Sequence, residues 1–330
     1  MTLSPQNKSG QSRRPVELGE SFDRQSPSPA TQPDLRREPP PKDWRRGAAA
    51  TACLTFDVDA ETVVLNKGAE HARCLSTMSH QAYGPRVGVP RILALLKRHQ
   101  LPATFFVPGE TAQRWPDTVR AILDAGHEIG CHGHTHRSLL QLSEDEQRDD
   151  LDLALEALQA VGVQPVGYRA PNWQLTRAAL ELLPSRGFVY DSSLMDDDRP
   201  YRLCAASGAL IELPVHWSLD DWAQYAFLPA PKIGSVIEAP AKLVDLWTGE
   251  LNAMRATGSL CVVVCHPFLS GRASRIAALE KFVDFARQCG DVRFTGAGQL
   301  ASEMGRAVEK RTDESQSSTT AAAAEAGGGG

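Results

Sequence analysis

Short apolar segments alternate with longer amphipathic segments along most of this chain. The apolar segments are rich in β-branched and aromatic residues and predict strands at 52–58, 103–108, 127–132, 166–170, 188–193, 210–215, 260–266 and 292–296. Between them, hydrophobic periodicity predicts helices over 89–99, 116–126 and 143–162. This alternation is typical of parallel strands covered by helices, and so many units in one domain favour a (β/α) barrel.

Two of the predicted helices carry clear end signals. Ser143 with Glu146 three residues later forms a capping-box pattern, and Gly162 supplies the stop. Pro116 stands at a first helical position and Gly126 just past the end of the same helix. These signals place the helices between the strands, as the barrel requires.

The two ends of the chain lack such patterns. Residues 1–47 are crowded with Pro, Ser, Gln and Arg and contain no apolar run, so we expect a disordered N-terminal arm. Residues 305–330 end in TTAAAAEAGGGG and are expected to form a disordered low-complexity tail. The remaining 48–304 suits a single α/β catalytic domain.

Composition narrows the class of protein. A formal net charge of −5 argues against nucleic acid as the main partner. The N-terminus shows no apolar core of a secretory signal, and no apolar run reaches the ~18 residues of a membrane span. The seven cysteines form no CxxC pair and are expected to be buried, reduced thiols. We therefore expect a cytoplasmic protein with no membrane partner.

Polar residues of the kinds used in catalysis follow several predicted strands. The side chains at or just after the C-terminal strand ends are Asp57, Asp59, His132, Arg169, Asp191 and His266. In a parallel barrel these ends meet on one face, which is where such barrels build their active sites. The sequence thus predicts one site that draws on residues far apart in the chain.

A metal site is the first candidate at this face. His132 and His136 are four residues apart and can bind one ion together. Two imidazoles and a carboxylate are a common ligand set for a catalytic Zn²⁺ with an open position for water. His134, between them, is expected beside the site or at the surface, and Cys131 is expected to pack rather than to ligate.

The remaining residues suggest acid–base chemistry. Asp57 and Asp59 are two apart, so one can hold the metal while the other accepts a proton from the activated water. Arg169 could pair with that free carboxylate, or form an ordinary structural salt bridge. His266 could protonate the leaving nitrogen if a neighbouring carboxylate such as Asp191 stabilises its imidazolium. The alternative for His266 is a capped core histidine at a strand end.

Assembled, these segments closely resemble the polysaccharide deacetylase family (NodB-homology, carbohydrate esterase family four). The resemblance spans roughly 50–300 and is carried, in order, by TFDVDAE (55–61), HGHTH (132–136), YRAPNW (168–173), YDSS (190–193) and CHPF (265–268). It implies a distorted (β/α) barrel of the NodB-homology type, and hydrolysis of carbon–nitrogen bonds other than peptide bonds. It also implies Zn²⁺ or another divalent ion such as Co²⁺, Ni²⁺ or Mn²⁺.

The resemblance also assigns roles to individual residues. Asp57 matches the catalytic base, Arg169 the partner of that base, and His266 the general acid. The matching metal ligands are Asp59, His132 and His136.

The chain departs from the usual first motif, in which two adjacent aspartates precede a glycine. Here Val58 separates them, a variant that resembles the intracellular peptidoglycan-deacetylase-like subgroup, which includes relatives acting on allantoin and cyclic imides. YGPRVGV (83–89) and LPVHWSLDDW (213–222) resemble this subgroup too, and the likeness implies a homo-oligomer. Their aromatic and paired acidic residues could wall off the site, or Trp217 and Trp222 could merely pack the barrel mouth.

Three functions remain open at this point. N-deacetylation of an N-acetylated amino sugar or polysaccharide, using a metal-activated water, comes first. A hydrolase of small linear or cyclic amides, similar to allantoin or a cyclic imide, comes close behind. The third is a barrel without catalysis that serves as a binding module.

Overall fold

A single mixed sheet organises the part of the chain that the structure describes. The computed structural model describes residues 35–307, and all of its helices and strands lie from Arg36 onward. The sheet has the order β1-β7-β8-β6-β5-β4-β3-β2-β10, with β9 paired to the other side of β2. The strands are β1 (Arg36–Glu38), β2 (Ala50–Asp57), β3 (Thr104–Val107), β4 (Glu128–Cys131), β5 (Gly167–Tyr168), β6 (Tyr190–Asp191), β7 (Tyr201–Ala205), β8 (Gly208–Glu212), β9 (Leu260–Cys265) and β10 (Val292–Phe294).

The strand with the most partners is β2, whose eight residues are all buried. Its first residues pair with β10 and its last with β3, while β9 runs along its other side, all parallel to it. Parallel pairing continues through β4, β5, β6 and β8. The C-terminal ends of these strands therefore meet on one face, as the barrel prediction requires.

The curled sheet does not close through a regular strand pair. After β8, the segment 213–221 crosses towards β9, where Asp220 forms a parallel bridge with Val264 and the Asp221 amide donates to the Val264 carbonyl. At its start, the Leu213 amide still donates to the Asp191 carbonyl. The barrel is therefore distorted, with an irregular segment bridging the gap between β8 and β9.

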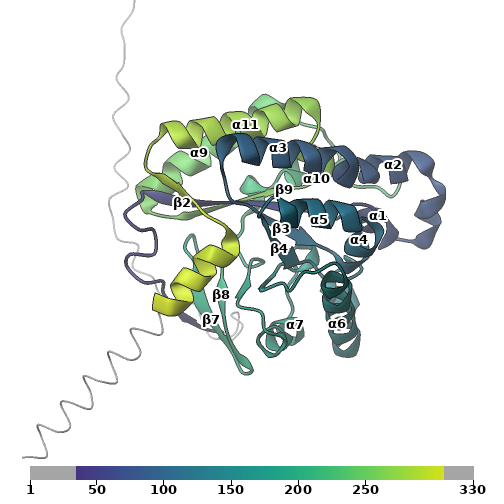
Figure 1. Cartoon of the computed structure of the whole chain (residues 1–330), viewed down its shortest axis with the longest axis horizontal. Helices are drawn as coiled ribbons and strands as arrows, with labels where there is room; N and C mark the ends of the chain where they lie inside the picture. The colour runs from purple at the N-terminus through teal and green to yellow at the C-terminus, as the bar shows by residue number, and fades with distance from the viewer. Residues whose placement is uncertain (1–34, 308–330) are drawn as a thin grey trace, which may run out of the picture. The chain divides into compact units, whose positions relative to one another are not determined.

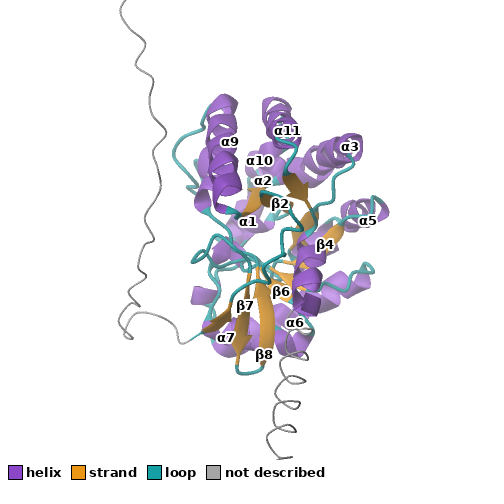
Figure 2. Ribbon diagram, turned by 90° about the vertical axis from the view of Figure 1, so that its left-hand side faces the viewer, coloured by secondary structure: helices purple, strands orange, loops and turns teal. Residues whose placement is uncertain are grey.

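Helices cover the outside of the strands (Figures 1 and 2). They are α1 (Thr62–Leu65), α2 (Leu75–Tyr83), α3 (Val89–His99), α4 (Gly109–Arg114), α5 (Pro116–Asp124), α6 (Glu144–Ala160), α7 (Arg177–Leu182), α8 (Trp222–Tyr225), α9 (Pro240–Thr257), α10 (Pro267–Ser270) and α11 (Ala273–Gln288). Residues 297–307 are also helical. The predicted capping box of α6 is present, with Ser143 and Glu146 bonding each other's backbone.

The expected end of the N-terminal arm at residue 47 is wrong. Arg36–Glu38 pairs antiparallel with β7, and Trp44 is only 8% exposed within the main apolar cluster. A tryptophan among polar residues is enough to anchor this stretch, because burying an indole removes a large apolar area from water. At the other end, helix continues to residue 307, past the expected boundary at 304. Residues 1–34 and 308–330 of the expected arm and tail lie outside the described part.

Within residues 35–307, no helix combines the length and the hydropathy that a membrane crossing needs. All seven cysteines are free, and four of them are buried: Cys53, Cys131, Cys261 and Cys265. Cys131 packs in the core, as expected.

Candidate active site

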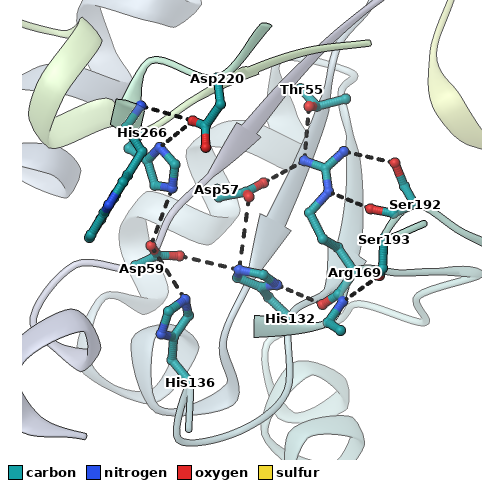
Figure 3. Close-up of polar contacts among 12 residues, drawn as sticks. Thr55, Asp57, Asp59, His132, His136, Arg169, Ser192, Ser193, Asp220 and His266 are labelled. Atoms are coloured by element: carbon teal, nitrogen blue, oxygen red, sulfur yellow. Dashed lines mark hydrogen bonds and ion pairs between the residues drawn. The ribbon is translucent and has the colours of Figure 1, made fainter. Parts of the chain in front are cut away.

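Four segments bring their polar side chains to the face where the parallel strands end. Figure 3 shows these side chains turned towards one another around a common centre. They are Asp57 and Asp59 at the end of β2, His132 and His136 after β4, Arg169 after β5, and His266 after β9.

The loop that carries the two histidines is fixed by a carboxylate from α6. Asp150 accepts hydrogen bonds from the His134 amide at 2.7 Å and from the Thr135 amide at 3.1 Å. Gly133 turns the chain with φ of 68°, in the left-handed region that glycine enters without strain. His134 is itself buried and contributes its backbone to this contact, while His132 and His136 reach the centre of the site.

Asp59, His132 and His136 form a group that fits a metal ion. Their ligand atoms all lie within 4.8 Å of one another. His132 Nε2 is 3.6 Å and His136 Nε2 is 3.5 Å from the Asp59 carboxylate. Both Asp59 oxygens are buried without a hydrogen-bond partner within residues 35–307, which is costly unless a cation is bound. Two imidazoles and one carboxylate match the ligands that catalytic Zn²⁺ and similar ions take.

The two histidines are in states suited to ligation. His132 Nδ1 lies 2.6 Å from the Arg169 carbonyl oxygen, which can only accept, so Nδ1 carries a proton and Nε2 is the nitrogen that remains to bind an ion. Burial lowers the pKa of His136 to about 4, although the Asp59 charge opposes it, so this imidazole is neutral near pH 7. Neutral imidazoles are the form that binds metals.

Asp57 lies outside this group of three ligand residues and has different surroundings. Arg169 Nη1 donates to its carboxylate at 2.7 Å, and Arg169 is completely buried. Burial by itself would raise the pKa of Asp57, but the charges of Arg169 and His132 outweigh it and hold that pKa below the ordinary value. Asp57 is therefore an ionised carboxylate beside the ligand group, the state that a general base needs.

His266 lies on the opposite side of Asp59 and is held by an acidic pair. Its Nδ1 is 2.7 Å from Asp221, and its Nε2 is 3.7 Å from Asp59. Burial would lower the pKa of His266, but the hydrogen bond and charge of Asp221, with the charge of Asp220, raise it to about 10. The imidazole is thus protonated near pH 7 and can give a proton from Nε2.

The expected pairing of His266 with Asp191 is wrong. Asp191 is completely buried, its Oδ1 accepts from the Ser193 hydroxyl, and it does not line the cavity. The segment 213–221 brings Asp221 to His266 instead, because its bridge to β9 ends next to the histidine. The sequence shows the acidic pair at 220–221 within LPVHWSLDDW, but it does not show that this segment lies beside β9. Asp150 of α6, which fixes the histidine loop, was also missed, since nothing local distinguishes it from the other acidic residues of that helix.

A small cavity of about 90 Å³ opens onto these groups. Its aromatic wall combines Trp173 and Trp217, whose rings lie 4.4 Å apart at 30°, with Trp222 beside His266. Trp217 lines the cavity and is 47% exposed, so it stands at the mouth. The full lining is Asp57, Asp59, His132, His136, Asn172, Trp173, Trp217, Asp220, Trp222 and His266.

The backbone of this wall is strained. Asn172 and Trp173 are consecutive non-glycine residues with φ of 56° and 55°. Such conformations persist only where the surrounding structure enforces them, and they gather at functional sites. The turn aims both side chains into the cavity.

Known proteins share this architecture and its sequence. The family model for polysaccharide deacetylases matches residues 82–190. A Mycobacterium smegmatis protein assigned to the polysaccharide deacetylases has a crystal structure that is 48% identical, with a TM-score of 0.80 over 84% of this chain and 96% of its own. A Pseudomonas aeruginosa crystal structure assigned to the same group is 25% identical, with a TM-score of 0.70 over 82% of this chain and 95% of its own. The peptidoglycan deacetylase of Helicobacter pylori is 27% identical over 69% of this chain and 87% of its own length.

An ionised carboxylate and a protonated imidazole on either side of a candidate metal site are an arrangement that suits hydrolysis. The likeness to the Mycobacterium smegmatis protein extends over nearly the whole of both described folds. The chain therefore belongs to the polysaccharide deacetylase family, whose reaction is the hydrolysis of N-acetyl amide bonds of sugars.

Proposed function

We propose that this protein removes the acetyl group from an N-acetylated amino sugar, free or within a polysaccharide. The observation that carries the proposal is that Asp57 and His266 line one cavity from different strands, with Asp59 between them. The base is ionised and the acid is protonated at the same pH. Hydrolysis of an amide needs both, because a water loses a proton and the leaving nitrogen gains one.

The residues divide the reaction as follows. Asp59, His132 and His136 hold a divalent ion, Zn²⁺ or Co²⁺, Ni²⁺ or Mn²⁺. Such an ion supplies Lewis acidity, which makes a water nucleophilic at neutral pH and polarises the amide carbonyl.

Asp57 takes the proton of the attacking water, and Arg169 keeps that carboxylate ionised and oriented. His266 donates its Nε2 proton to the nitrogen as the carbon–nitrogen bond breaks, and Asp221 stabilises the imidazolium beforehand. The products are acetate and the free amine.

The wall of the cavity supports a sugar substrate. At the mouth, the half-exposed Trp217 packs against the buried Trp173, and its indole offers an aromatic surface on which an apolar ring face can lie. Asn172 places an amide beside it, which can donate to and accept from hydroxyl groups. The relatives are named for peptidoglycan and polysaccharide substrates, which agrees with this surface.

A second candidate, hydrolysis of small or cyclic amides, is favoured by one observation. The cavity measures only about 90 Å³, and Trp222 and Asp220 narrow it beside His266. A small cyclic amide would be enclosed in this cavity, whereas a polysaccharide could place only one of its sugar units there. The reading as a binding module without catalysis fits poorly, since loss of activity would be expected to erode the base, the acid or a ligand.

A comparison of the turnover of two substrates distinguishes these two candidate functions. We expect the zinc-loaded protein to release acetate from N-acetylglucosamine oligomers and to leave succinimide intact. The matched control is Asp57→Asn, which keeps the shape of the base and should release no acetate above background. Ring opening of succinimide without acetate release would replace the proposal by the second candidate. Turnover of neither substrate by protein that holds a stoichiometric ion would favour the binding module.

The other expectations from the sequence remain predictions. They are a cytoplasmic location, a homo-oligomeric state, and the absence of nucleic-acid and membrane partners.

A further inference from the structure

Two carboxyl groups lie side by side on neighbouring strands, outside the cavity. Asp191 and Glu212 are register partners across β6 and β8, and both are completely buried. Two ionised carboxylates side by side in the interior would repel each other and would both lose their hydration. One of the two is therefore expected to carry a proton.

One oxygen of each carboxyl group accepts hydrogen bonds from residues 193 and 194. Glu212 Oε1 accepts from the Ser193 amide at 3.1 Å and the Leu194 amide at 2.9 Å. Asp191 Oδ1 accepts from the Ser193 hydroxyl at 2.9 Å. Asp191 Oδ2 and Glu212 Oε2 have no hydrogen-bond partner among the described residues. A proton between these two oxygens satisfies both at once.

The surroundings favour Glu212 as the member that holds the proton. Burial raises the pKa of Glu212 well above its ordinary value, and the charge of Asp191 raises it further. Burial also raises the pKa of Asp191, to about 6, while hydrogen bonds and the charge of Arg169 oppose the rise. The other titratable groups facing the pair are the phenols of Tyr168 and Tyr201, which are neutral. The pair thus carries a single negative charge near Arg169.

Residues 192–194, which bond to the carboxyl pair, also bond to Arg169 and to the residue after it. The Ser192 carbonyl accepts from Arg169 Nε at 3.0 Å, and the Ser192 hydroxyl accepts from Nη2 at 2.9 Å. The Ser193 hydroxyl accepts from the Ala170 amide at 2.9 Å. With these donors occupied, Nη1 is left to bond Thr55 and the base Asp57 (Figure 3).

We propose that Asp191 and Glu212 share one proton, and that this pair positions Arg169, and through it Asp57, by fixing residues 192–194. Neither carboxyl group lines the cavity, so both are positioning residues. The positioning role rests on the proposed function, whereas the shared proton does not.

The shared proton is tested by infrared difference spectroscopy at neutral pH. Glu212→Gln keeps the shape and the bonds, because its amide oxygen accepts from residues 193 and 194 and its amide N–H donates to Asp191. The spectrum of wild type minus this variant should contain the C=O band of a buried carboxylic acid. A difference spectrum with carboxylate bands alone would overturn the proposal. This measurement needs no substrate and is independent of the activity.

The positioning role is tested by comparing Glu212→Gln with Glu212→Leu, which cannot accept from residues 193 and 194. In the leucine variant we expect kcat to fall by about 10²-fold, as for a misplaced catalytic group, with KM and metal content unchanged. The glutamine variant should restore kcat. Wild-type kcat in the leucine variant would overturn the positioning role.

A readout without substrate separates this inference from the proposed function. Exchange of the Arg169 Nε–H proton, followed by NMR, should be slow in wild type and Glu212→Gln and fast in Glu212→Leu. Equal exchange in all three proteins would contradict the positioning role, even if neither proposed substrate were turned over.

Discussion

At the scale of single residues, two carboxylates with one residue between them have different surroundings. Asp57 is paired with the buried Arg169, whereas the oxygens of Asp59 face two imidazoles and have no hydrogen-bond partner in the part of the chain that the structure describes. A compensated carboxylate can serve as a base, whereas an uncompensated buried one calls for a cation. Sequence spacing alone gave no means of telling which aspartate does which, and the resemblance supplied the assignment.

Asp221→Asn tests how His266 is kept protonated. Asparagine can still accept from His266 Nδ1 but carries no charge, so the pKa of His266 should fall from about 10. As the pH rises, His266 then loses its proton at a lower pH than in the wild type. We expect the alkaline limb of the kcat/KM profile to move to lower pH, with a loss beyond it that approaches about 10²-fold.

The matched control for this change is Asp191→Asn. Because Asp191 does not contact His266, the alkaline limb should stay at its wild-type pH, whatever happens to the size of kcat. A limb that moved in Asp191→Asn and not in Asp221→Asn would restore the pairing expected from the sequence.

At the scale of elements, the sequence predicted the regular part of the fold well. The helix expected over 89–99 is α3, and the apolar run at 52–58 is β2 with its bounds shifted by one or two residues. Strong periodicity and end signals determine such elements locally. The strands expected at 166–170 and 188–193 shrink to two residues each, because the backbone after them leaves the sheet to hold Arg169.

Trp44→Ala tests the N-terminal stretch that the sequence assigned to a disordered arm. Trp44 is 8% exposed in the cluster that includes Leu300 and Met304. Removing the indole should lower the free energy of unfolding by about 3 kcal/mol, measured by urea denaturation. Leu75→Ala, at a side chain that is 82% exposed, is the control and should change it by less than about 0.5 kcal/mol. Equal effects of the two changes would show that residues 35–47 do not belong to the folded domain.

At the scale of the whole molecule, the site depends on where the barrel departs from regularity. The segment 213–221 bridges β8 and β9, and it brings Asp220 to the cavity and Asp221 to His266, with Trp222 of the cavity wall directly after it. Residues on regular strand ends were predictable, because parallel strands bring those ends together. The partner of His266 was not predictable, since it depends on which strand an irregular segment lies beside. The pairing of this segment with β9 produces no hydrophobic periodicity from which the sequence could predict it.

The central claim is that Asp59 belongs to the metal site and Asp57 does not. The most direct measurement is the metal content of purified Asp57→Asn and Asp59→Asn, determined by mass spectrometry after equal zinc loading and dialysis. We predict one ion per chain in Asp57→Asn, as in wild type, and little or none in Asp59→Asn. An ion retained by Asp59→Asn and lost from Asp57→Asn would contradict the account and reverse the roles of the two aspartates.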